Sequence, residues 1–253
     1  MSDYSEREVY KGYRITLSHD DLGESPREEC DNFGTMICWH NRYIIGDKHN
    51  YRGPEQFLQN FLEVNYEETL YAKLMRACER RGNQLGYNWE PTIKDMFPIF
   101  QQVALVLPIW AYEHGGITIS TSNRGYPFCD RWDSGQLGWI YVTLDDVRKE
   151  FNRKRLSKKV IEKAYDILRQ EVETYDQYLT GDVWFYEVDK WVGGTLDEDE
   201  YEDEEDYMDD DDCWEFVDNL GGLYGSEYAL KEAQDVVDYH IAQQQKEGKC
   251  ETL

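Results

Sequence analysis

A chain of 253 residues, of which 40% are hydrophobic and 15% aromatic, can bury a core and is too apolar to be disordered throughout. Its formal net charge of -25, from 52 acidic and 27 basic residues, argues against nucleic acid or an anionic membrane as a direct partner, because phosphate surfaces select Lys and Arg. The charge favours a partner protein with a basic surface.

The cysteines and the N-terminal sequence indicate a compartment. The six cysteines are scattered without a C-x-x-C pair, which predicts reduced thiols and neither a disulfide framework nor a zinc site. The first ten residues, MSDYSEREVY, have no apolar signal region, and no stretch approaches the roughly 18 apolar residues of a membrane span. We therefore expect a cytoplasmic protein.

The first half of the chain predicts short strands followed by a helical pair. Strands are expected at residues 9–17, 35–39 and 42–45, which are rich in β-branched and aromatic residues. A helix is expected to begin at Pro54, because proline suits the first helical position. An apolar period then predicts a second helix from residue 70, which is expected to stop at Gly82.

The second half predicts further strands and two long helices. Strands are expected at residues 103–112, 117–120, 137–142, 182–192 and 213–217. Pro108 should bend the first of these strands or lie at a sheet edge, because proline has no N–H to donate. Thr143 and Asp146 form a capping-box pattern, and apolar periodicity predicts helices over residues 157–179 and 226–245.

This order of elements predicts an α+β fold with a mainly antiparallel sheet and helices packed on one side. The strands do not alternate strictly with helices, so a doubly wound parallel sheet is not expected. We predict a single domain over residues 1–253. The last two strands should form a hairpin, joined by an acidic insertion at residues 195–212 whose composition is that of a mobile loop.

The acidic insertion is the most distinctive feature of the sequence. Residues 195–218, TLDEDEYEDEEDYMDDDDCWEFVD, contain 15 acids and no Lys, Arg or His. Neighbouring residues are about 3.3 Å apart in a strand and 1.5 Å in a helix, and duplex DNA carries one charge per roughly 1.7 Å of axis. The run therefore has the charge density of a nucleic acid and could compete for the basic groove of a nucleic-acid-binding protein.

The predicted partner-binding residues are the acids of the insertion and its two tyrosines, since an interface needs buried aromatic anchors as well as charge. They are Asp197, Glu198, Asp199, Glu200, Tyr201, Glu202, Asp203, Glu204, Glu205, Asp206, Tyr207, Asp209, Asp210, Asp211 and Asp212. Two alternatives stay open. The run could be a solvating loop, or it could cover the basic segment 148–163, which could itself bind phosphate when uncovered.

Several stretches resemble a known family. They are residues 25–28 (SPRE), 31–40 (DNFGTMICWH), 46–49 (GDKH), 107–108 (LP), 112–118 (YEHGGIT), 132–142 (WDSGQLGWIYV), 171–182 (EVETYDQYLTGD) and 213–216 (CWEF). In these the chain resembles a widespread family of phage and prophage proteins of unknown function. The resemblance implies a phage-type protein in the host cytoplasm and implies no reaction. The chain departs from the family pattern at Glu113-His114-Gly115, where Asp-His-Ser is expected, and in its longer acidic insertion.

Three histidines within these stretches suggest an alternative function. Brought together with nearby carboxylates, they could hold zinc, manganese or iron, although neither H-E-x-x-H nor H-x-H occurs. They are His40, His49 and His114.

The leading interpretation is a stoichiometric inhibitor, of an anti-defence kind, that mimics nucleic acid and occludes a host nucleic-acid-binding enzyme. Such an inhibitor requires no catalytic residue and no cofactor. The alternatives are a metal-dependent enzyme that uses the three histidines, and an accessory scaffold protein with a solvating acidic loop.

Overall fold

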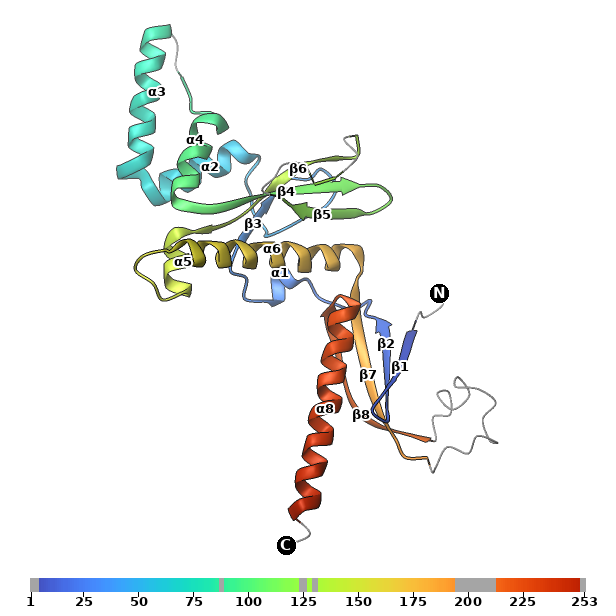
Figure 1. Ribbon diagram of the computed structural model, residues 1–253. Coiled ribbons are helices and arrows are strands. Elements are labelled where there is room, and N and C mark those ends of the chain that lie inside the picture. Colours follow the sequence, from blue (N-terminus) through green and yellow to red (C-terminus); the bar gives the residue numbers. More distant parts are fainter. Residues whose placement is uncertain (1–4, 87–88, 123–126, 129–131, 194–212, 251–253) are drawn as a thin grey trace. The chain divides into compact units, whose positions relative to one another are not determined.

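The computed structural model describes residues 5–86, 89–122, 127–128, 132–193 and 213–250 (Figure 1). The chain forms two compact units. Residues 1–26 and 177–253 make up the terminal unit, and residues 27–176 make up the central unit. The prediction of one domain over the whole chain stays a prediction, whereas the α+β class is confirmed.

The terminal unit is a four-stranded antiparallel sheet with a helix on one face. The strand order is β1-β2-β7-β8, with bounds Ser5–Tyr10, Tyr13–His19, Val183–Trp191 and Trp214–Tyr224. Helix α8 (Ser226–Cys250) packs on the sheet through Ala229, Ala233 and Val237, which are fully buried. The predicted hairpin of the last two strands is thus confirmed, while the whole insertion, residues 195–212, lies outside the described residues.

The prediction of one strand over residues 9–17 was wrong, because the chain turns back between β1 and β2. Lys11 and Gly12 have φ angles of 52° and 82°, as in the two-residue turn that suits a twisted hairpin. Lysine rarely adopts a positive φ, so this turn has no clear signal in the sequence.

The central unit is also built on a four-stranded antiparallel sheet, in the order β3-β6-β4-β5. The strands are Thr35–Cys38, Ser134–Thr143, Ala104–Glu113 and Ile117–Thr121. Pro108 of β4 faces Trp139 of β6, but β5 pairs with β4 only from Ile109 onward. The proline therefore occupies a part of the strand that β5 leaves unpaired, which suits a residue without an N–H.

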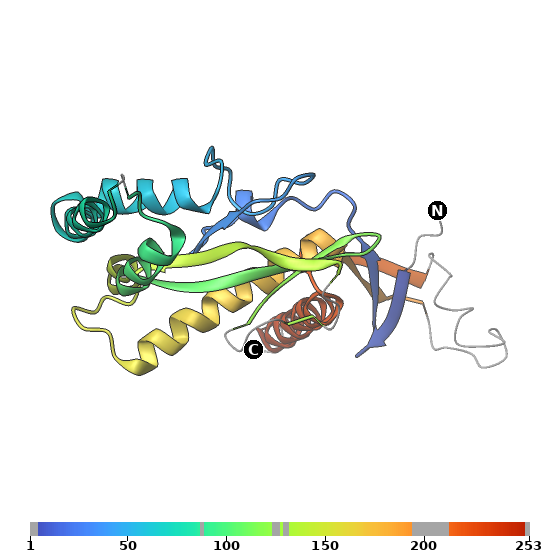
Figure 2. The same ribbon diagram turned by 90° about the horizontal axis from the view of Figure 1, so that it is seen from above.

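Helices cover this sheet on both faces, with α2 on one side and α6 on the other (Figure 2). The helical elements are α1 (Pro26–Glu29), α2 (Pro54–Tyr66), the π-helical turn η1 (Glu67–Tyr71), α3 (Ala72–Leu85), α4 (Ile93–Val103), α5 (Leu144–Glu150) and α6 (Lys158–Thr180). An aromatic core joins α2 and α4 to the sheet, with Phe57, Phe61 and Phe100 packed against Trp139 and Tyr141.

Three expectations for this unit need correction. Residues 42–45 are not a strand, because the chain loops out there and returns at Gly46 to bridge Ile37. Helix α3 passes through Gly82 and ends at Leu85, where Gly86 takes a left-handed φ of 77° as the cap. Helix α4 was not predicted at all, although Thr92 and Asp95 form its capping box.

Candidate functional site

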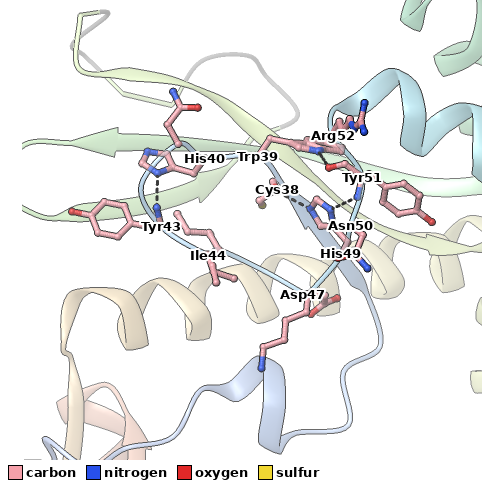
Figure 3. A pocket seen from close by; sticks show the side chains of 13 residues that line it. Cys38, Trp39, His40, Tyr43, Ile44, Asp47, His49, Asn50, Tyr51 and Arg52 are labelled. Atoms are coloured by element: carbon pink, nitrogen blue, oxygen red, sulfur yellow. Dashed lines mark hydrogen bonds between the residues drawn. The ribbon is translucent and has the colours of Figure 1, made fainter.

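Four of the family-like stretches, residues 25–28, 31–40, 46–49 and 171–182, meet around the loop that follows β3. Residues 38–52 leave the strand and double back, and the amide of Asp47 donates to the carbonyl of Met36 at 2.8 Å. The loop encloses a hollow of about 620 Å³ that holds His40 and His49 among its lining residues (Figure 3). The hollow thus contains two of the three histidines that were predicted to bind a metal ion.

A buried arginine fixes the loop. The side chain of Arg27 is 2% exposed, and its Nε and Nη2 atoms donate to the two carboxylate oxygens of Asp47, each at 2.8 Å. Its Nη1 atom donates to Asn32 at 2.8 Å and to Glu171 at 3.0 Å, and Nη2 also reaches the Gly34 carbonyl at 2.7 Å. We name this group of side chains the Arg27 hub.

The carboxylates of the hub are bound by backbone as well. Asp47 accepts from the amide of Met36 at 2.8 Å, and Glu171 accepts from the amide of Phe33 at 2.6 Å. Burial raises the pKa of Glu171, while the Phe33 amide and the Arg27 charge act in the opposite direction. These groups are saturated with partners, so the hub joins four of the family-like stretches structurally and offers no free group for catalysis.

Two of the three histidines are also satisfied by the loop. A backbone N–H can only donate, so Nδ1 of His49 accepts from Tyr51 at 3.3 Å, and its Nε2–H donates to the Cys38 carbonyl at 2.8 Å. Nδ1 of His40 likewise accepts from the amides of Arg42 and Tyr43, each at 3.2 Å. Neither ring has a lone pair left for a metal ion.

The third histidine belongs to a separate pair. Nδ1 of His114 lies 3.3 Å from Asp133, and the His114 side chain is 73% exposed. His40 lies instead against Glu113, with 3.4 Å between Nε2 and the carboxylate. Among the residues that the structure describes, no group of three or more His, Cys, Asp or Glu is placed to hold a metal ion. The geometry of this region therefore does not favour the metal-enzyme alternative.

The ends of β7 and β8, which flank the acidic insertion, are well packed. Its predicted partner-binding residues, 197–212, lie outside the described residues, but the strand ends on either side are described. Trp191 and Trp214 face each other across the hairpin with ring centroids 5.0 Å apart. Beside them Arg14 forms a buried ion pair with Asp189 at 3.0 Å and lies over the Trp214 ring. The strand ends that flank the insertion are thus packed against each other.

The charge of the protein is divided unequally between the two units. The terminal unit has 30 acidic and 7 basic residues, a net charge of -23. The central unit has 22 acidic and 20 basic residues, a net charge of -2. Nearly all of the excess charge therefore belongs to the unit that carries the insertion.

The same unit presents a second acidic surface that the sequence analysis missed. Tyr228 and Tyr239 on α8 are 51% and 67% exposed, and Glu232 and Asp235 lie between them at helical spacing on the face away from the sheet. A hydrogen bond to Glu232 raises the pKa of Tyr228. We name these four residues the α8 stripe. Their i, i+4, i+7, i+11 spacing is the sequence pattern that could have predicted this surface.

Comparisons with known proteins identify no relative of the chain. Family models, curated proteins and solved structures all fail to match the chain. In the described part of the chain, no helix combines the length and apolar composition needed to cross a bilayer. Any function must therefore be argued from charge and geometry.

Proposed function

We propose that this chain is a phage-type inhibitor that acts in the host cytoplasm as a mimic of nucleic acid. Its acidic insertion would fill the basic groove of a host nucleic-acid-binding enzyme, in the manner of an anti-defence factor, and block the groove stoichiometrically. The observation that carries the proposal is the charge division, with -23 of the net -25 in the terminal unit.

The proposal has a physical basis in both rate and affinity. A dense run of like charge steers a cationic partner toward it. Its effect on the association rate is larger than its effect on affinity. Affinity requires aromatic anchors that become buried in the interface. Tyr201 and Tyr207 in the insertion, with Tyr228 and Tyr239 of the α8 stripe, are the residues that we propose supply them.

A pull-down from host lysate tests the proposal. The bait is the intact protein, beside a variant of equal length in which the 13 acids of residues 197–212 are replaced by Asn and Gln. We expect the intact protein to recover a nucleic-acid-binding enzyme at low salt and to release it at high salt, because surface charge attraction is screened. Equal recovery by both baits, or recovery of proteins that bind no nucleic acid, would contradict the mimic.

A further inference from the structure

The connection between α5 and α6, together with the first turns of α6, carries a cluster of positively charged side chains. Residues 153–163 contain six cations and one acid in a chain that has 52 acids and 27 bases. We name the six the basic turn: Arg153, Lys154, Arg155, Lys158, Lys159 and Lys163. All six are exposed.

The basic residues of α5, unlike those of the basic turn, form ion pairs. Arg148 and Lys149 on α5 pair with Asp145 and Asp146 at 2.6 and 2.8 Å, three residues away. None of the basic-turn side chains forms an ion pair with a residue that the structure describes. The segment 148–163 thus contains two neutralised cations followed by six that are not neutralised by the described fold.

These positions are unfavourable for the stability of the helix. Lys158 and Lys159 lie in the first turn of α6, where the helix dipole is positive and acidic residues are preferred, and this turn has no acid. Lys159 and Lys163 are four residues apart, a spacing at which like charges repel. Cations at these positions break a local rule of helix formation, and such breaks are expected at functional surfaces.

We propose that the basic turn binds the phosphate backbone of nucleic acid. The two arginines can each hold a phosphate with two hydrogen bonds, and the lysines add point charges along the same turn. The only aromatic residue of the α5–α6 connection, Phe151, packs against Phe33 with ring centroids 6.2 Å apart. It is therefore not placed to stack on bases, and the binding should depend on backbone charge and little on sequence.

The overall charge is no obstacle to this binding, although it led us above to expect no nucleic-acid partner. The central unit has a net charge of only -2, because the acids are concentrated in the terminal unit. The proposal concerns a different unit from the mimic and does not rest on it.

Fluorescence anisotropy with a labelled 20-base-pair duplex and the full chain tests the basic turn. The test variant combines Arg153→Gln, Arg155→Gln and Lys159→Gln. The matched control combines Lys73→Gln, Arg76→Gln and Arg80→Gln, three exposed cations on α3. We expect the test variant to bind at least tenfold more weakly at 50 mM salt, with a log–log salt slope shallower by about 3, and the control to change less than twofold. Circular dichroism confirms that both variants fold.

The same titration in the background that lacks the 13 insertion acids separates the remaining outcomes. Binding that appears only in this background, and is lost with the three basic-turn substitutions, supports the site. Equal binding by the test variant and the control would overturn the proposal. Absence of duplex binding in both backgrounds would overturn it as well.

Discussion

Replacement of Arg27 by methionine is expected to lower the free energy of unfolding by about 3–5 kcal/mol, the loss seen when one partner of a buried ion pair is removed. Methionine keeps much of the side-chain volume but leaves the partly buried carboxylates of Asp47 and Glu171 without their cation. Urea unfolding followed by tryptophan fluorescence and by far-UV circular dichroism measures the change.

An exposed ion pair with the same N–O distance provides the control. Arg42 contacts Glu113 at 2.8 Å, but the Arg42 side chain is 74% exposed, so Arg42→Met should cost less than about 1 kcal/mol. Adding Asp47→Leu and Glu171→Met to Arg27→Met should recover part of the loss, because the unpaired charges are then gone. Equal losses for Arg27→Met and Arg42→Met would show that the hub does not hold the loop.

Replacement of all 13 acids of residues 197–212 by Asn and Gln is expected to slow association with the captured enzyme by about 10- to 1000-fold at low salt. The intact protein should associate more slowly as salt rises, whereas the variant should show little salt dependence. Stopped-flow mixing over a series of salt concentrations measures both rates. The dissociation rate should change less, since aromatic contacts contribute more to the lifetime of the complex.

A smaller pair of variants separates local from overall charge. Asp209, Asp210, Asp211 and Asp212 changed to Asn raise the net charge by four, and so do Glu55, Glu63, Glu79 and Glu162 of the central unit changed to Gln. Only the first variant should slow association, by about tenfold. If both variants slow it equally, net charge rather than the insertion steers the encounter.

Much of the fold could be predicted because it is encoded in local patterns. The apolar run of β4 and the long periodic helices α6 and α8 lie close to where the sequence placed them. Helix α4 was missed because Pro91 precedes it and Pro98 lies inside it, which reads as a loop. The β1–β2 turn was missed because it requires a lysine at positive φ.

The candidate sites also differ in whether a local sequence pattern encodes them. Charge is visible in the sequence, so both the acidic insertion and the basic segment were recognised there. The Arg27 hub was not, because it joins Arg27 to Glu171, which is 144 residues away, and no local pattern specifies that pair. His40 and His49 lie in the loop that the hub holds, and their ring nitrogens bind atoms of that loop. Their place in the family-like stretches therefore reflects the structure of the loop and not a metal site.

If the protein mimics nucleic acid, the inhibitor and nucleic acid occupy the same groove of the target enzyme. A competition titration tests this most directly, with the basic-turn variant Arg153→Gln, Arg155→Gln, Lys159→Gln as the inhibitor, so that its own affinity for nucleic acid is reduced. We predict that the apparent Kd of the inhibitor for the enzyme rises in proportion to the concentration of the enzyme's nucleic acid and that no ternary complex forms. A ternary complex with an unchanged Kd would contradict the claim.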